Sequence, residues 1–177
     1  MKICKTCNET KPFDEFSNHP TTADKKYPDC KECQSGKMAE LYKQGALFLS
    51  SLPVDGSRRD KAIFWGINDK HSVKKFIKKL VSQSNGCIEY NGCKTHNGYG
   101  ALAIRNGSIV LSTVKAHRFA FALANGFDAL PKGETGNRSD TLVINHICHN
   151  RACCNPDHLE VMTHAKNVAY RRPKNAA

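Results

Sequence analysis

Cysteine pairs near the start of the chain have the spacing of metal ligands. Cys4 and Cys7 form one CxxC pair, and Cys30 and Cys33 form a second pair. Each pair offers two thiolates to one tetrahedral ion, so the two pairs together predict a four-cysteine zinc site. Because four cysteines leave no open position for a substrate, we expect this zinc to be structural rather than catalytic.

A second group of metal-binding residue types lies near the end of the sequence. Residues 146–159 read His-Ile-Cys-His-Asn-Arg-Ala-Cys-Cys-Asn-Pro-Asp-His-Leu. Within this run Cys148, Cys153 and His158 recur at regular spacing and supply three ligands of the kinds that zinc prefers. Tetrahedral zinc needs a fourth ligand, which another cysteine of the chain must provide.

Three cysteines compete for that fourth position. Cys87 is the first choice because it lies on an upstream strand, and Cys93 and Cys154 are the alternatives. Cys154 directly follows Cys153, and adjacent side chains seldom point at the same ion, so we expect Cys154 to be a small core residue. The sequence therefore predicts a second structural zinc and leaves its fourth ligand open.

The charge balance of the chain points to a polyanionic partner. In 177 residues, 27 Lys and Arg face 16 Asp and Glu, for a formal net charge of +11. Nucleic acid is the favoured partner of so basic a chain. No stretch reaches the roughly 20 apolar residues of a membrane span, so no membrane partner is expected. Clustered cysteines of this kind are typical of the reducing cytoplasm.

The elements that must position these groups fall into three expected parts. Residues 1–50 hold the CxxC pairs and a helix, which Gly45 weakens, and residues 51–84 form a basic linker and helix. Residues 85–177 form an α+β module. Domains this small bury little apolar surface, so metal sites would be useful in holding them together.

In the basic middle part, apolar residues between Val73 and Val81 mark an amphipathic helix with Ser72 as its expected N-cap. The polar face of this helix carries Lys74, Lys75, Lys78 and Lys79. A solvated face and a face that tracks phosphates explain these lysines equally well, so both interpretations stay open.

The last part of the chain is expected to hold short strands and two helices. The expected elements are strands at 87–90, 99–104 and 108–111 with a turn at Asn106-Gly107, a helix over 116–125 that Gly126 stops, a strand at 141–145 and a last helix capped by Thr163. Together these elements predict the α+β class for this part of the chain.

The motif of residues 146–159, followed by Asn167, resembles the ββα-metal core of HNH endonucleases. It is most similar to the His-Cys box and related branch common in phage and intron-encoded homing endonucleases. The resemblance covers about residues 87–170 and includes Gly98-Tyr99-Gly100 and Ala116-His117-Arg118. It implies an α+β chain with a small N-terminal zinc module and a C-terminal ββα-metal nuclease domain over residues 85–177.

The resemblance implies a role for each residue that matches the family pattern. His146 stands where the family has the general base that activates water, and Asn167 stands where it has a ligand of the catalytic Mg²⁺. The zinc ligands of the family match Cys148, Cys153 and His158, with Cys87 as their upstream partner. The commonest form of the family has His rather than Asn at position 167, and the His-Cys box branch tolerates Asn there.

A phosphate-binding arginine is also implied, because the family often uses one from the preceding hairpin. Arg105, beside the Asn106-Gly107 turn, is the nearest candidate, and Arg118 is the alternative. The resemblance assigns no role to His117.

The function expected from these residues is that of a metal-dependent endonuclease that hydrolyses phosphodiester bonds of duplex DNA. The resemblance implies site-specific cleavage of the homing type, two structural Zn²⁺ ions, one catalytic Mg²⁺ and action in the cytoplasm, that of the host cell for a phage protein. Related enzymes include monomers and dimers, so a homodimer stays open. The alternative is a non-catalytic, two-zinc nucleic-acid-binding protein, which His146 and Asn167 disfavour.

Overall fold

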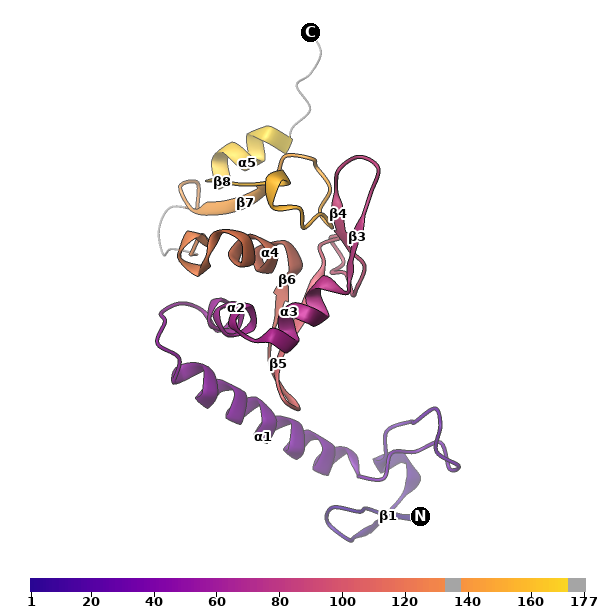
Figure 1. Cartoon of the computed structure of the whole chain (residues 1–177). Helices are drawn as coiled ribbons and strands as arrows, with labels where there is room; N and C mark the ends of the chain where they lie inside the picture. Colours follow the sequence, from indigo (N-terminus) through magenta and orange to yellow (C-terminus); the bar gives the residue numbers. More distant parts are fainter. Residues whose placement is uncertain (133–137, 172–177) are drawn as a thin grey trace. The chain divides into compact units, whose positions relative to one another are not determined.

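The computed structural model describes residues 1–132 and 138–171 and divides the chain into two units, Met1–Leu47 and Phe48–Ala177 (Figure 1). Each unit combines helical segments with small antiparallel strand pairs, so the predicted α+β class is confirmed. None of the helices in the described ranges has the length and apolar character needed to cross a bilayer.

The first unit is a pair of short strands and a loop that lead into a long helix. Its elements are β1 (Lys2–Ile3), β2 (Thr10–Lys11), the 3-10 turn η1 (Phe13–Glu15) and α1 (Lys31–Ser50), whose end lies in the second unit. The core of this unit is small and consists of Phe16 packed against the cysteines of the CxxC pairs. The predicted helix is confirmed, and it continues through Gly45 without interruption.

The second unit carries the other helices and three antiparallel strand pairs, β3–β4, β5–β6 and β7–β8. Its elements are α2 (Arg58–Asn68), α3 (Lys70–Ile77), β3 (Leu80–Ser82), β4 (Ile88–Tyr90), β5 (Ala101–Asn106), β6 (Ile109–Lys115), α4 (Ala116–Asn125), η2 (Phe127–Ala129), β7 (Leu142–His146), η3 (Pro156–His158), β8 (Leu159–Thr163) and α5 (His164–Arg171).

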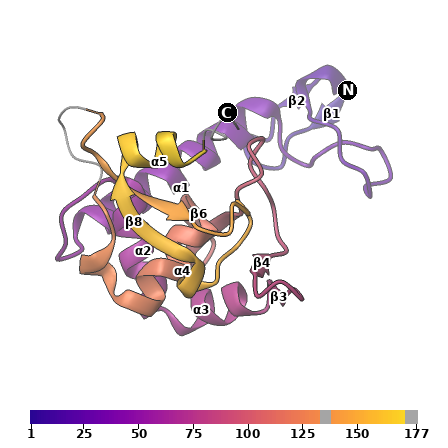
Figure 2. The same ribbon diagram turned by 90° about the horizontal axis from the view of Figure 1, so that it is seen from above.

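The core of the second unit forms where α2 and α4 meet the β5–β6 hairpin. Ile63, Phe76, Ile104, Leu111 and Phe119 are almost fully buried there. Helix α4 lies between α2 on one side and the β7–β8 hairpin on the other, and α5 covers the far side of that hairpin (Figures 1 and 2). The β7–β8 pair, whose first strand ends at His146, therefore packs against an apolar core.

The middle of the chain differs from the sequence-based expectation. Residues 51–84 contain two helices rather than a linker and one helix, and both pack in the second unit. Helix α2 begins with a capping box, in which Ser57 and Asp60 satisfy each other's backbone N–H groups. The prediction that Ser72 caps the next helix is wrong. The cap is Asp69, whose carboxylate accepts from the Ser72 N–H at 2.8 Å, because the helix begins one turn earlier.

Several of the local signals in the last part of the chain are confirmed. The Asn106-Gly107 turn joins β5 to β6, with Gly107 at a φ of 56°, and α4 ends at Gly126. Strand β8 was not expected. It pairs with β7 so that His146 lies opposite Leu159, and this pairing places the end of β7 beside the metal-binding loop of residues 148–158.

Candidate functional site

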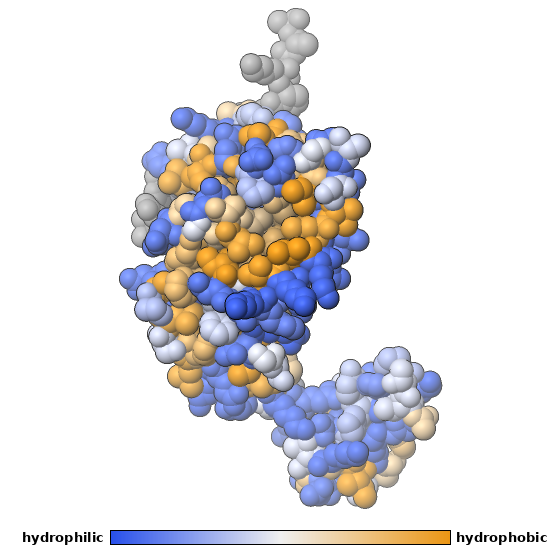
Figure 3. Space-filling view, viewed as in Figure 1, coloured by the Kyte–Doolittle hydropathy of each residue, from blue (hydrophilic) through white to orange (hydrophobic). Residues whose placement is uncertain are grey.

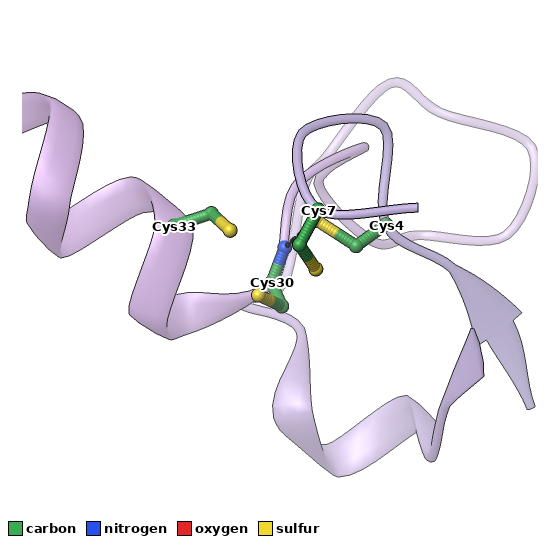
Figure 4. A group of neighbouring side chains, drawn as sticks. All are labelled: Cys4, Cys7, Cys30 and Cys33. Carbon is green, nitrogen blue, oxygen red and sulfur yellow. Dashed lines mark hydrogen bonds between the residues drawn. The ribbon is translucent and has the colours of Figure 1, made fainter. Parts of the chain in front are cut away.

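The four N-terminal cysteines form a cluster. The sulfur atoms of Cys4, Cys7, Cys30 and Cys33 all lie within 4.8 Å of one another. Figure 4 shows Cys33 on the first turn of α1, directed toward the three cysteines of the preceding loops. Zinc–sulfur bonds of about 2.3 Å would hold four sulfurs at roughly this separation, so the cluster could hold a metal ion such as zinc.

Backbone N–H groups favour the thiolate form of one cysteine of this cluster, Cys4. The N–H groups of Cys30 and Thr6 donate to Cys4 Sγ at 3.3 and 3.4 Å. Burial raises the pKa of Cys4, but the N–H groups of Cys30, Cys7 and Thr6 outweigh burial and lower that pKa to about 6. The pKa of Cys33 is instead raised to about 12 by the neighbouring Cys30 and by burial. Thiolate is the form that binds metal, so the backbone favours the metal-binding form of Cys4, whereas Cys33 needs the ion itself to lose its proton.

The second cluster joins parts of the chain that are far apart in the sequence. Its four ligand atoms, which lie within 4.8 Å of one another, belong to Cys87, Cys148, Cys153 and His158. His158 Nδ1 lies 3.6 Å from the sulfurs of both Cys87 and Cys153. Three sulfurs and one imidazole nitrogen form a set that zinc accepts, so this cluster could also hold an ion.

The other two cysteines considered for the fourth ligand lie outside this group. Cys93 is exposed, and Cys154 is buried among the hydrophobic side chains of the second unit. The prediction that Cys154 is a small core residue is therefore confirmed. Among these three cysteines, the one that the fold brings to the cluster is Cys87.

Hydrogen bonds attach the metal-binding loop of residues 148–158 to β4. The Tyr90 N–H donates to the Ala152 carbonyl at 2.9 Å, and the Cys154 N–H donates to the Ile88 carbonyl at 2.6 Å. The Asn150 side chain adds a bond to Glu89 at 2.6 Å. Because β4 directly follows Cys87, these bonds hold Cys87 against the loop without any ion.

His146 is the last residue of β7 and is buried. Its Nε2 lies 3.2 Å from the carbonyl oxygen of Cys153. A carbonyl can only accept, so Nε2 carries a proton, and whenever the ring is neutral its lone pair lies on Nδ1. The metal-binding loop thus sets both the orientation and the tautomer of this histidine.

A small polar pocket opens in front of His146. Its volume is about 220 Å³, and its lining residues are Tyr99, Asn145, His146, His149 and Arg151. The Arg151 guanidinium lies 5.7 Å from the centre of the Tyr99 ring, and its Nη1 donates to the Asn97 carbonyl at 3.0 Å. The pocket therefore combines a proton acceptor with a positively charged donor that is held in place.

One wall of the pocket is held in an unusual backbone conformation. His149 has a φ of 57°, in the left-handed region that few residues other than glycine adopt. Its ring stacks on Tyr170 of α5, with ring centres 4.9 Å apart and planes 13° apart. Strained residues of this kind collect at functional sites, so His149 is a candidate to which the sequence assigned no role.

His117 lies behind His146 in the interior of the unit. The two ring centres are 4.6 Å apart in an edge-to-face arrangement, and Tyr99 is 5.3 Å from His117. Burial, followed by the nearby charge of His146, lowers the pKa of His117 well below its usual value. Within the described residues its Nδ1 has no hydrogen-bond partner. His117 is thus a neutral packing partner of His146.

Asn167 lies on α5, which packs against β7. Its side chain is buried, and no group in the described part of the chain hydrogen-bonds to its Oδ1. An unsatisfied buried amide oxygen costs about 1–3 kcal/mol. A hard cation, which prefers oxygen ligands, would satisfy this atom, so the residue fits the Mg²⁺ ligand that the motif implies.

The two arginines proposed from the sequence lie elsewhere. Arg105 donates to the Ser108 carbonyl of its own turn at 3.4 Å and lines a different pocket. Arg118 is engaged by Asp60 at 3.1 Å and by the Pro131 carbonyl at 2.9 Å. The arginine that shares a pocket with His146 is Arg151. Its position between the ligands of the second cluster was a signal that the sequence analysis did not use.

Residues 114–169, about a third of the chain, match the family described as HNH endonuclease. This segment contains His117, His146, Asn167 and the loop of the second cluster, and the C-terminal unit therefore carries an HNH endonuclease domain. The chain is also 32% identical over 94 residues to "Protein 2.8" of Escherichia phage T7. The match covers 53% of this chain and 55% of that protein, so the chain spans about half the length of this relative. No solved structure matches the chain.

An HNH endonuclease domain supports a nuclease that acts on nucleic acid. Nucleases of this family use divalent metals, and the chain provides two Cys/His clusters that could hold metal ions such as zinc. The likeness to a phage protein agrees with the phage character of the motif.

Proposed function

We propose that this protein is a divalent-metal-dependent endonuclease that hydrolyses phosphodiester bonds in duplex DNA. The observation that carries the proposal is the pocket of His146, in which a histidine of set tautomer shares its opening with Arg151. The lining residues of the pocket other than Tyr99 lie within the segment that matches the HNH endonuclease family.

In this proposal His146 is the general base. Its Nδ1 accepts the proton of the attacking water, because Nε2 already donates to the Cys153 carbonyl. The imidazolium that forms keeps that hydrogen bond, and the carbonyl dipole stabilises the new charge. A histidine is suited to this step since its unperturbed pKa of about 6.5 lies near neutral pH.

Asn167 is the proposed protein ligand of a catalytic Mg²⁺, as its unsatisfied buried Oδ1 supports. A bound Mg²⁺ would neutralise charge on the scissile phosphate and on the leaving oxygen. With one amide as its protein ligand, the ion would be held weakly until DNA phosphate and water complete its coordination.

The arginine that steadies the scissile phosphate is, in this proposal, Arg151 rather than Arg105. Arg151 lines the His146 pocket, whereas Arg105 contacts its own turn. A guanidinium braced by a carbonyl and an aromatic ring loses little freedom when it binds a phosphate oxygen.

The cysteine clusters complete the proposal as two structural zinc sites, one of which attaches the loop behind His146 to the rest of the domain. Site-specific cleavage of the homing type is supported by the motif resemblance. Action in the cytoplasm of a host cell is supported by the likeness to a phage protein.

Plasmid cleavage with Mg²⁺ tests the proposal, with wild type, His146→Ala and His96→Ala compared. His96 is an exposed histidine outside the pocket. We expect His146→Ala to slow cleavage by about 10²–10⁴-fold, the range of general-base catalysis, while DNA affinity and zinc content stay unchanged. His96→Ala should cleave like wild type. A wild-type protein that binds many DNAs but cuts none would instead indicate the two-zinc binding protein.

A further inference from the structure

A second, larger groove of the C-terminal unit lies beside the His146 pocket. It has a volume of about 520 Å³ and runs between the beginning of α2 and the paired ends of β5 and β6. Its charged lining residues are Arg59, Asp60, Lys115, Arg118 and Lys132. Among the described residues that line the groove, four cations against one carboxylate leave three net positive charges.

The single carboxylate is already occupied. Asp60 forms an ion pair with Arg118 at 3.1 Å and closes the capping box of α2, so it does not compensate the other cations. Arg59 and Lys132 are exposed, and neither has a carboxylate partner within residues 1–132 and 138–171. The positive charges of Arg59 and Lys132 are therefore available to an anion from outside.

The groove and the His146 pocket meet at Tyr99. Lys115, which lines the groove, places its Nζ 4.6 Å from the centre of the Tyr99 ring. The backbone N–H of Thr95, another groove residue, donates to the Tyr99 carbonyl at 2.8 Å. Tyr99 itself lines the pocket of His146. A single anionic polymer could thus cross from one to the other.

We propose that this groove, defined by Arg59, Lys115 and Lys132, binds backbone phosphates of the DNA strand on one side of the cleaved bond. The inference rests on the proposed function, since it places the scissile phosphate at His146. A DNA strand repeats its charge every 3.4 Å or so along the helix axis, so a strand held at His146 carries further phosphates to its neighbourhood. Cations in a groove bind such phosphates without reading the base sequence.

The lysine-rich face of α3 is the competing surface. Figure 3 shows an apolar strip over α3 and α4, and it includes Val73, Ile77 and Leu123, with Lys70, Lys74 and Lys78 lining the same hollow. Ile77 is 54% exposed there. A phosphate backbone gains nothing from apolar side chains, whereas the groove beside Tyr99 has Ser57, Thr95 and Thr113 in its lining together with its cations. The groove is therefore the better site for DNA.

The test compares two double variants that remove the same charge, Arg59→Gln/Lys132→Gln in the groove and Lys70→Gln/Lys74→Gln on α3. Binding of a labelled duplex is measured by fluorescence anisotropy from about 50 to 200 mM salt, without Mg²⁺ so that no DNA is cut. We expect the groove variant to bind roughly tenfold more weakly or worse. Its salt dependence, as the slope of log K against log salt, should fall by about 1.8, which corresponds to two lost phosphate contacts.

The α3 variant should keep nearly the wild-type slope. The inference is wrong if the groove variant keeps the wild-type slope, or if the α3 variant loses as much. These binding results are independent of the cleavage assay. A wild-type protein that binds DNA without cutting it would contradict the proposed nuclease, but the binding of the two variants could still be compared. A wild-type protein that binds no duplex DNA at all would overturn the proposal that the groove binds DNA.

Discussion

Arg151 and Arg105 lead to opposite expectations for single-residue substitutions. Replacing Arg151 with Ala should slow single-turnover cleavage by about 10²-fold or more, because a donor aimed at developing phosphate charge acts mainly in the transition state. DNA affinity should change only a few-fold, and added guanidinium should restore part of the rate. Arg105→Ala is the matched control and should cleave like wild type.

Zinc content must be measured for Arg151→Ala, because Arg151 lies between two residues of the second cluster. The opposite pattern, with cleavage lost only in Arg105→Ala, would return the phosphate-binding role to the hairpin and contradict the assignment from the pocket.

His117 should make the stability of the protein depend on pH. Burial lowers its pKa in the folded state, so as pH falls below about 6.5 the unfolded state takes up a proton first. The free energy of unfolding is therefore retained above about pH 6.5 and falls below it, by up to about 1.4 kcal/mol per pH unit. Urea unfolding at several pH values should show a flatter profile for His117→Gln, whereas His96→Gln should follow wild type. Parallel profiles for His117→Gln and wild type would contradict a buried neutral histidine.

Helix α2 packs on its neighbours through Gly66. A Cβ at this position would lie 2.8 Å from the Phe119 ring and 3.0 Å from an Ile104 methyl group, closer than side chains tolerate. Although alanine favours helices, Gly66→Ala should lower the free energy of unfolding by about 1–3 kcal/mol. In α1 a Cβ at Gly36 meets nothing within 4 Å, so Gly36→Ala should leave stability unchanged or raise it by about 0.5–1 kcal/mol. Equal stability of both variants, measured by urea unfolding, would contradict the close packing of α2.

Elements with strong local signals were predictable from the sequence. Asn106-Gly107 indicates its hairpin and Gly126 ends α4, because few other residues adopt the left-handed conformations found at Gly107 and Gly126. Helix α2 and strand β8 were not expected. Strand β8 is short and follows a loop directly, and its partner β7 is the element that makes it a strand. Strand pairing of this kind depends on a neighbour that the local sequence does not reveal.

Over the whole molecule, the metal sites should determine whether each unit is stable. We expect two zinc ions per chain by metal analysis, and one in Cys87→Ser. Cys87→Ser should also lower the melting temperature of the second unit, because Cys87 connects β4 to a loop about 60 residues later and the ion closes that long loop. Cys93→Ser, at an exposed cysteine outside the cluster, should keep both ions and the wild-type melting temperature. A Cys87→Ser protein that retains both ions would contradict the ligand set.

Residue spacing was sufficient to predict the four-cysteine cluster, three ligands of the second cluster and the HNH motif, and the basic charge balance predicted a nucleic-acid partner. CxxC pairs bring their sulfurs together locally, and a short loop can present several ligands to one ion. The ligands of such sites can therefore be recognised from their spacing in the sequence. The resemblance of the motif to the HNH family likewise indicates His146 and Asn167 as candidate site residues.

The tertiary structure decided which residues surround His146. Arg151, Tyr99 and His149 come from two separate segments, and they meet because the loop that follows β7 is bonded onto β4. Arg105 is close to a conspicuous turn in the sequence, yet its side chain lies at the hairpin tip and away from the pocket. The groove of Arg59, Lys115 and Lys132 likewise exists only because α2 packs against the β5–β6 hairpin, and packing between distant segments leaves no periodic trace in the sequence.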